Sequence, residues 1–465
     1  MIGFYCIRFI GRELVFLILL LGISLFYYTL YQSRSPLVYG IDGPYYLIQI
    51  DYIRSTGGMY YGDPPLTFYV LYLFYLVFGD SMAAVKIGSV FFSSLTVIPL
   101  FMLVRRRYGL EPAMVSTLLY IFSPHIIRLM GDFVKNTFGL LFLTIYLYFM
   151  MLWFREGRVS YLVFTVVALI LTGLTHILAF GILMIYTLVY PLAMYISGRG
   201  KGLLKASIPL IVSIALFTII SYTLYPFYFS DFNRIQSYIG SILTKDLEYQ
   251  VGRPRPSGPS LWNLLTYLIT PLALLVASTP LVLHGLIRRK IDQLLFSSYI
   301  VLLILLNPLS SSGVFFRFTL SSIIPSALIL AYMISRYKGY LEIASITLLI
   351  LAPTITLSLQ VATTWGPTIT LDEYRELVEA SKYVVTDKSS YARSIGITRY
   401  WLEYVVGPDR VVRKSVHPTG TLYIFISKDR VEPLPPPRPF EEIVFDGEHI
   451  QVRRITIRTL EDPRT

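Results

Sequence analysis

Cysteine and charge are what this 465-residue sequence has least of. It holds one cysteine, Cys6, so the chain forms no internal disulfide and offers no thiolate cluster for a metal. Charged residues make up 15% of the chain, against roughly 25% in ordinary soluble domains. No internal repeat stands out. The first hydrophobic stretch follows Arg8 and Arg12 but lacks a small-residue cleavage site, which predicts a retained helix and not a removed signal.

Apolar residues are abundant. They make up 55% of the chain, with 37 tyrosines and 29 phenylalanines, a composition typical of a polytopic α-helical membrane protein. About eleven stretches are long enough to cross roughly 30 Å of hydrocarbon. They lie near 14–33, 82–104, 112–124, 136–153, 161–179, 181–197, 207–228, 262–287, 294–310, 315–335 and 340–361.

Basic clusters predict the orientation of these helices. They fall in every second loop, which favours an N-inside, C-outside chain. The clusters are Arg105 to Arg107, Arg155 with Arg158, Arg199 with Lys201 and Lys205, Arg288 to Lys290, and Arg336 with Lys338. This register requires that the apolar stretch 66–79 does not cross. It spans roughly 21 Å and follows Pro64-Pro65, so we predict an interfacial or re-entrant helix.

The net charge of +12 is mostly a consequence of topology. Residues 1–361 hold 25 Lys and Arg against 13 Asp and Glu, whereas 362–465 hold 15 of each. Nucleic-acid binding is therefore not indicated. We predict a transmembrane catalytic domain over 1–361 and a small C-terminal α/β outer domain over 362–465. In the latter we expect helices at 372–383 and 397–405, a strand at 421–427, and two strands around an Asp446-Gly447 turn.

The first outer segment places Asp42 beside Tyr45 and Tyr46, with Asp63 in a turn further on. Aromatic ring faces contact sugar C–H groups and a carboxylate can accept a hydroxyl proton, so the pattern suits a sugar or acceptor site. The alternative is an amphipathic interfacial helix anchored by its tyrosines.

The second outer segment carries His125, Arg128, Asp132 and Lys135. Their steps of three or four residues would line them along one face if the segment is helical. The alternative is a solvated loop helix.

Two further polar residues lie within predicted spans. Arg317 is just inside the outer boundary, where a lipid-facing arginine is costly, so it should face a cavity or bind an anion such as a lipid phosphate. Snorkelling to the interface is the alternative. His176 lies near the outer end of its helix, where a lone histidine is more commonly a hydrogen-bonded packing residue.

The order of these segments resembles that of the GT-C glycosyltransferases, which include oligosaccharyltransferases, protein O-mannosyltransferases and aminoarabinose transferases. The resemblance covers about the first 180 residues. It is carried by Asp42-Gly-Pro-Tyr-Tyr, the Pro-Pro-Leu helix start, Arg-Arg-Arg-Tyr-Gly, Ser123-Pro and Gly131-Asp132.

The resemblance implies a polyprenyl-phosphate sugar donor, transfer at the outer face, and inversion at the anomeric carbon. Asp42 would be the first-loop catalytic carboxylate and Asp132 the second-loop acidic residue, with a divalent metal as an optional cofactor held by the same two carboxylates. Lys135, Arg128, His125, His176 and Arg317 would bind the lipid phosphate. The sequence departs from oligosaccharyltransferases, because it lacks their second-loop acidic pair and a Trp-Trp-Asp signature in the tail.

The sequence therefore predicts a multi-pass cell-membrane glycosyltransferase whose active site is extracytoplasmic. Its expected partners are the lipid-phosphate donor, membrane lipids and an acceptor protein or glycolipid. A transporter or flippase of lipid-linked or small anionic substrates is the rival, and it would place ionisable residues at mid-membrane on broken helices. A membrane-anchored surface protein is a third reading, in which Asp42 and Asp132 are incidental.

Overall fold

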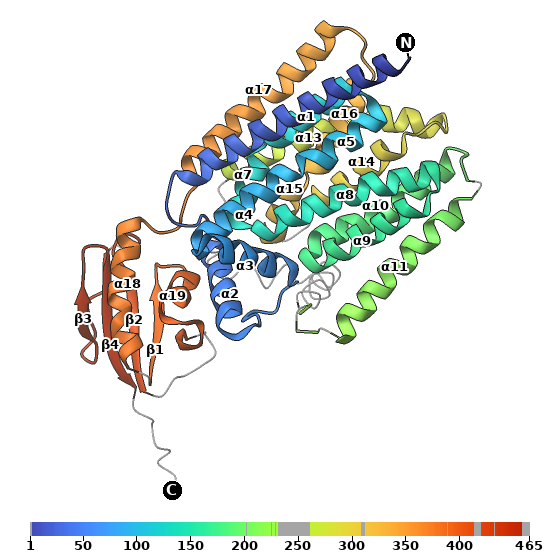
Figure 1. Ribbon diagram of the computed structural model, residues 1–465. Helices are drawn as coiled ribbons and strands as arrows, with labels where there is room; N and C mark the ends of the chain where they lie inside the picture. The colour runs from blue at the N-terminus through green and yellow to red at the C-terminus, as the bar shows by residue number, and fades with distance from the viewer. Residues whose placement is uncertain are drawn as a thin grey trace. The chain divides into compact units, whose positions relative to one another are not determined.

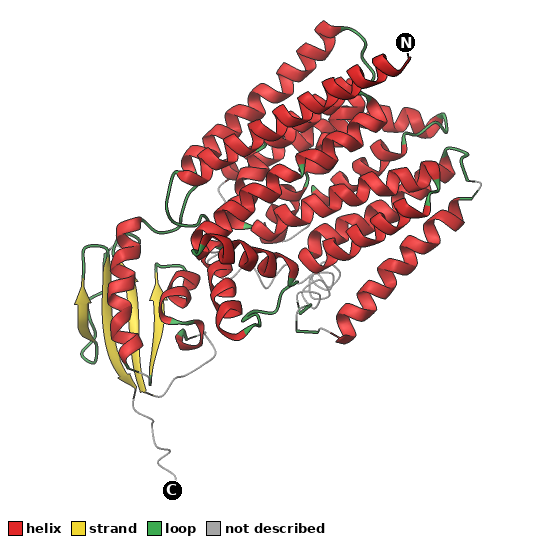
Figure 2. Cartoon of the chain, viewed as in Figure 1, coloured by secondary structure: helices red, strands yellow, loops and turns green. Residues whose placement is uncertain are grey.

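The computed structural model is mainly helical, with a small sheet near the C-terminus (Figure 1, Figure 2). It describes residues 2–200, 202–224, 226–227, 229–230, 261–307, 312–387, 389–412, 420–431 and 433–457. The chain forms two compact units. The first comprises Met1–Ser33, Tyr61–Val70 and Lys86–Thr364, and the second Arg34–Tyr60, Leu71–Val85 and Trp365–Thr465. The division into domains at 361/362 stays a prediction.

The first unit is built almost entirely of helices. They are α1 (Ile2–Ser33), α5 (Val97–Tyr108), α6 (Leu110–Ile121), α7 (Pro124–Asp132), α8 (Val134–Glu156), α9 (Val159–Thr175), α10 (Ile177–Ile196), α11 (Leu203–Leu224), α13 (Leu261–Ile287), α14 (Gln293–Leu305), α15 (Ser312–Ser321), α16 (Ile323–Ile334) and α17 (Tyr340–Thr364). Two more helices have residues in both units, α3 (Leu66–Phe78) and α4 (Ser81–Leu95).

Membrane-spanning helices follow from length and composition. Within the described residues, seven helices are long and apolar enough to cross a bilayer, or up to nine if each of two bent pairs is one span. The shorter α9 and α14 are also apolar, and each predicted hydrophobic stretch overlaps a helix in its described residues, although 161–179 crosses the helix break at His176. The predicted fold class, a polytopic helical membrane protein with a small C-terminal α/β part, is confirmed. The number of spans and their orientation stay predictions.

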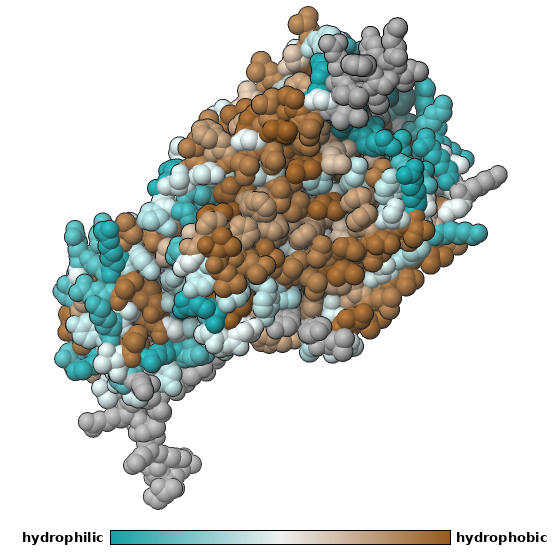
Figure 3. Space-filling view, in the orientation of Figure 1, coloured by the Kyte–Doolittle hydropathy of each residue, from teal (hydrophilic) through white to brown (hydrophobic). Residues whose placement is uncertain are grey.

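Surface composition agrees with a lipid-facing bundle. Leu348 and Leu349 of α17 are 70% and 76% exposed, an arrangement that is unfavourable in water and ordinary against acyl chains. On the face drawn in Figure 3, apolar side chains cover the long helices, whereas polar ones gather over the C-terminal strands and at helix ends.

Basic residues of a predicted cytoplasmic loop also fix helices to one another. Arg107 at the end of α5 is paired at 2.5 Å with Asp292, whose other oxygen accepts from the Tyr108 hydroxyl at 2.7 Å. Asp292 also caps α14, accepting from the Leu295 N–H at 2.9 Å. The Asp292 carboxylate therefore compensates both the partial positive charge at the N-terminus of α14 and the positive charge of Arg107.

The second unit combines α2 (Gly43–Thr56) with a four-stranded sheet and two helices. The strands are β1 (Ser390–Ile395), β2 (Gly420–Ser427), β3 (Glu442–Asp446) and β4 (Ile450–Ile457), in the order β1-β2-β4-β3. The helices are α18 (Leu371–Thr386) and α19 (Arg399–Val406), with a short 3-10 turn at Pro408–Arg410. β1 and β2 are parallel and the other pairs antiparallel.

The sequence predictions for this unit hold for both helices, for the strand at 421–427 and for the hairpin. Strand β1 was not predicted. It pairs with β2 in parallel, which needs a crossover, and α19 lies in that connection. The core between helices and sheet contains Trp401, Phe425 and Val452, none of them exposed.

Candidate functional site

The second predicted outer segment folds into a short helix between two breaks. Ser123 caps α7 by accepting from the His125 N–H at 3.2 Å, and Pro124 occupies the first turn, where its missing N–H costs nothing. α6 and α7 are bent by 45° at this point. α7 ends at Asp132, and Phe133 has the non-helical angles φ −131° and ψ 55° before α8 begins. Lys135 therefore starts a new helix, and the single face predicted for all four residues is wrong for Lys135.

His125 is used inside the protein. Its side chain is 1% exposed, with Nε2 2.9 Å from the Tyr267 carbonyl oxygen and Nδ1 2.7 Å from Ser123 Oγ. A carbonyl only accepts, so Nε2 donates and Nδ1 accepts the serine hydroxyl proton. Both ring nitrogens are thus satisfied by the packing of α7 against α13. This geometry argues against the predicted phosphate-binding role of His125, and the segment is not a solvated loop helix.

Two buried ion pairs lie around the α7–α8 break. Arg128 and Asp132 meet at 2.6 Å, with side chains 12% and 3% exposed. Lys135 and Asp63 meet at 2.5 Å, with side chains 13% and 5% exposed. The sequence context suggested a turn residue, but Asp63 also forms a buried ion pair. Its carboxylate neutralises a lysine that would otherwise be buried with an uncompensated charge.

The remaining predicted phosphate ligands are close to these pairs. Lys135 and Arg317 both act electrostatically on His176, and the guanidinium of Arg317 lies 4.9 Å from the centre of the Phe133 ring. Gly139, one turn beyond Lys135, permits this approach, because a Cβ there would lie 3.2 Å from the His176 Cβ and 2.8 Å from the Ala179 Cβ. We call this group, Asp63, Arg128, Asp132, Lys135, His176 and Arg317, the α7–α8 cluster.

Charge within the α7–α8 cluster is unbalanced. Three cationic side chains stand against two carboxylates, which leaves one excess positive charge with His176 neutral. Arg317 is exposed, and within the described residues no carboxylate pairs with it. Phe133 stacking holds its guanidinium in place and leaves its N–H donors in the guanidinium plane, where a phosphate can be bound by two of them.

Asp42 belongs to the second unit, at the N-terminus of α2. Its position is set by Gly40, whose φ of 72° favours glycine and whose N–H donates to the Gly366 carbonyl at 3.1 Å. Aspartate is a good N-cap, yet the Asp42 side chain makes no capping hydrogen bond to α2. It is half-buried, so helix capping does not account for this carboxylate.

Aromatic residues surround the same end of α2. The Tyr45 ring lies 5.5 Å from that of Tyr46 and 5.4 Å from that of Tyr400 in α19. Tyr46 is 1% exposed and is a core side chain, which leaves little of its surface for a sugar, whereas Tyr45 is half-buried. Burial and the nearby Asp42 carboxylate raise the pKa of Tyr400. Nothing in the sequence linked Tyr400 to Asp42, since more than 350 residues separate them.

A neighbouring arginine completes this second group. Arg399 lies 5.0 Å from the centre of the Tyr400 ring and pairs with the buried Glu403 at 3.0 Å. We call Asp42, Tyr45, Arg399 and Tyr400 the α2–α19 cluster. Its aromatic rings around one carboxylate fit the predicted contact with sugar or acceptor.

A divalent metal needs several carboxylate, histidine or cysteine donors around one point. The described residues include no group of three or more His, Cys, Asp or Glu side chains placed to hold an ion, and Asp132 is engaged with Arg128. The donors among the described residues therefore do not fit a divalent metal, and no chemical step is assigned to one.

Comparison with known proteins identifies a matching sequence family and solved structures with a similar fold. Residues 62–225 match the sequence model of the family described as dolichyl-phosphate-mannose-protein mannosyltransferase. A search of curated protein sequences finds no match. Among solved structures, ArnT from Cupriavidus metallidurans bound to undecaprenyl phosphate is 11% identical, with a TM-score of 0.58 over 97% of this chain and 98% of that chain.

Two further structures are similar. The same ArnT in the apo state is 13% identical, with a TM-score of 0.57 over 96% and 98% of the two chains. The oligosaccharyltransferase of Archaeoglobus fulgidus, in complex with Zn and sulfate, is 15% identical, with a TM-score of 0.56 over 85% of this chain and 62% of that one. The family match and the shared fold confirm the prediction of a membrane glycosyltransferase of the GT-C type.

Proposed function

We propose that this protein transfers a sugar from a polyprenyl-phosphate donor to an acceptor at the extracytoplasmic face of the cell membrane, with inversion at the anomeric carbon. The α7–α8 cluster binds the donor phosphate. Asp42 of the α2–α19 cluster accepts the proton of the attacking hydroxyl. Asp132 and Asp63 hold Arg128 and Lys135 in position.

One observation carries the proposal, the excess positive charge of the α7–α8 cluster with Arg317 exposed. Arg128 and Lys135 are each neutralised by a buried carboxylate, whereas Arg317 is exposed and pairs with no carboxylate among the described residues, so its charge is available to an anion. A phosphate monoanion or dianion supplies the missing charge, and its oxygens match the planar donors of a guanidinium. The polyprenyl phosphate reported with the similar ArnT structure is a ligand of this chemistry.

The chemistry follows from the charges that change. As the acceptor oxygen attacks the anomeric carbon, the carbon–oxygen bond to phosphate breaks and the proton of the acceptor passes to the Asp42 carboxylate. Negative charge grows on the departing lipid phosphate, where Lys135 and Arg128 stabilise it, while Arg317 binds a phosphate oxygen that is charged before and after the bond breaks. Tyr45 and Tyr400 present ring surface to the C–H groups of the sugar or acceptor.

The direct test is transfer by the purified full-length protein in liposomes. A polyprenyl-phosphate sugar with a labelled sugar is supplied together with membrane components extracted from the native source, and label in the products is measured. We expect transfer by the wild-type protein and release of polyprenyl phosphate in equal amount. If the labelled sugar stays on the donor lipid although the protein binds that lipid, the protein does not perform this reaction.

A further inference from the structure

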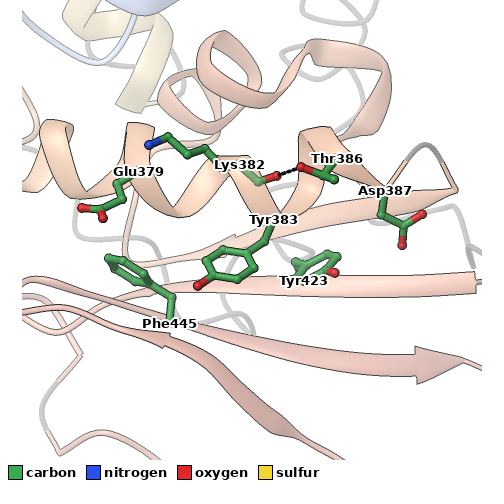
Figure 4. Close-up of a pocket in the computed structure, with 7 residues that line it drawn as sticks. All are labelled: Glu379, Lys382, Tyr383, Thr386, Asp387, Tyr423 and Phe445. Carbon is green, nitrogen blue, oxygen red and sulfur yellow. Dashed lines mark hydrogen bonds between the residues drawn. The ribbon is translucent and has the colours of Figure 1, made fainter.

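A cavity in the second unit lies outside both clusters. It is an open pocket between α18 and strands β2 and β3, with a volume of about 450 Å³ (Figure 4). Small-molecule sites in proteins fall in the range of about 300–1,000 Å³, so a monosaccharide or disaccharide unit fits. The helix contributes charged and hydroxyl side chains, and the helix and the two strands each contribute an aromatic ring.

Aromatic rings form one wall of the cavity. Tyr383 of α18 and Phe445 of β3 lie with ring centres 6.4 Å apart at 61°, and Figure 4 shows both rings beside Tyr423 in the space between helix and sheet. Tyr383 is 43% exposed, whereas Tyr423 is 6% exposed and forms the floor. The inclined faces of Tyr383, which is exposed, and Phe445, which is partly exposed, present apolar surface in two directions for the C–H groups of a pyranose.

Carboxylates flank these rings. Figure 4 places Glu379 on one side of them and Asp387 on the other. Hydrogen bonds from the Ser389 hydroxyl at 2.7 Å and from its N–H at 3.0 Å lower the pKa of Asp387, which keeps it ionised at neutral pH. Within the part of the chain that the structure describes, Glu379 makes no hydrogen bond or ion pair. Ionised carboxylates only accept, so a ligand here must bring donors.

The charges of the side chains that line the cavity further restrict which class of ligand can bind. Two carboxylates and the ammonium of Lys382 line the cavity, and in Figure 4 that ammonium points away from the rings. A phosphate or carboxylate ligand would be repelled. An acyl chain would leave the carboxylates without donors. A neutral polyhydroxyl ring satisfies both the carboxylates and the aromatic faces.

We propose that the cavity between α18, β2 and β3 binds a neutral saccharide, with Tyr383 and Phe445 packing on the sugar ring and Glu379 and Asp387 accepting its hydroxyl hydrogens. None of the residues that line the cavity belongs to the α7–α8 cluster or the α2–α19 cluster. If the protein has the proposed function, the bound sugar belongs to a glycan-bearing acceptor.

Saturation-transfer NMR on the full-length protein in nanodiscs tests the binding, with no donor lipid present. The probes are methyl α-mannopyranoside, methyl β-glucopyranoside and methyl α-galactopyranoside. We expect signal transfer to at least one of them. Tyr383→Ala should raise its Kd about 10-fold through lost ring contact. Glu379→Gln, at an exposed position that leaves the fold intact, should raise it by about three-fold to ten-fold.

Phe440→Ala is the matched control, since Phe440 is 59% exposed in the same unit and does not line the cavity. Its Kd should equal that of the wild type. The proposal is overturned if none of the three glycosides receives saturation, or if Tyr383→Ala and Glu379→Gln bind as the wild type does. Asp42→Asn should bind the glycoside normally while losing transfer, so failure of this inference and failure of the proposed function give different results.

Discussion

The carboxylates of the two units are held in different ways. In the first unit Asp63 and Asp132 are almost fully buried and each meets a cation at 2.5–2.6 Å. In the second unit Asp42 is half-buried among tyrosines. It stands at the N-terminus of α2, but its side chain makes no capping hydrogen bond to that helix. The carboxylates of Asp63 and Asp132 each neutralise a buried cation, whereas the Asp42 carboxylate lies near the Tyr400 ring and does not cap its helix.

This difference separates the two roles of a transferase. Buried ion pairs hold cations in one geometry, which suits binding of a phosphate that is charged before and after reaction. A half-buried carboxylate beside aromatic rings is suited to accept a proton that moves only during the reaction. Substitutions in the two units should therefore change different kinetic quantities, and the predictions below use that contrast.

The largest expected difference is all-or-none and concerns the membrane side of each region. In a chain with Cys6 replaced by Ser, cysteine at Gly58 should react with an impermeant maleimide from outside, and cysteine at Gly200 only after permeabilisation. The basic residues of the 199–205 loop predict that this loop lies inside. Ser257, a second position predicted to be outside, lies beyond the described residues. Labelling of Gly200→Cys in intact cells would show that the orientation is the reverse of the predicted one, and the argument for a site on the outer face would then fail.

Asp42→Asn should lower the transfer rate by about 100-fold to 10,000-fold, because the amide keeps the size and loses the basicity of a general base. Donor affinity should stay the same. Steady-state transfer in liposomes gives the rate, and fluorescence or calorimetry with polyprenyl phosphate gives the affinity.

Asp51→Asn is the control for this change. Asp51 is on the same helix but accepts from the Ser81 hydroxyl at 2.7 Å, so its loss should be far smaller. A fully active Asp42→Asn protein would mean that another carboxylate takes the proton.

Sequence alone predicted the helical bundle, α18, α19 and the β3–β4 hairpin, because hydrophobic length and alternation are local signals. It also selected Lys135, His176 and Arg317, which the structure brings together. It missed the partners that fix these residues. Asp63 precedes Lys135 by 72 positions, and a pairing across that separation leaves no periodic trace.

The same limit explains the errors at α7 and α2. A three- or four-residue step is consistent with one helix through Lys135, but the break at Phe133 depends on how α7 and α8 pack, which periodicity does not report. Tyr45 and Tyr46 are indistinguishable in the sequence. Only tertiary packing buries Tyr46 and leaves Tyr45 partly exposed.

Removing one partner of the Lys135–Asp63 pair should destabilise the protein by about 3–5 kcal/mol, because it leaves an uncompensated buried charge. Asp63→Asn and Lys135→Met should each lower the midpoint of thermal unfolding in detergent, and the double variant should recover most of the loss. Additive losses in the double variant would show that the two side chains are not coupled.

The smallest effect is expected at Arg317. Arg317→Ala should weaken polyprenyl-phosphate binding by about 10-fold to 100-fold, the value of one or two charge-assisted hydrogen bonds, and leave the rate at saturating donor almost unchanged. Arg317→Lys should recover part of the affinity, since it keeps the charge and loses the planar pair of donors. Stability should stay at the wild-type value because Arg317 is exposed and its only described partner is the Phe133 ring.

Arg336→Ala is the matched control, because Arg336 also lies over an aromatic ring, 6.0 Å from the centre of Tyr332, in a loop predicted to be cytoplasmic. It removes an equal charge and a similar ring contact on the other predicted side of the membrane, so donor affinity should not change. Equal losses in both variants would mean that the phosphate responds to net charge and not to a defined site. Loss of rate without loss of affinity in Arg317→Ala would instead place Arg317 with Asp42 in the chemical step, and the contrast between the two units would fail.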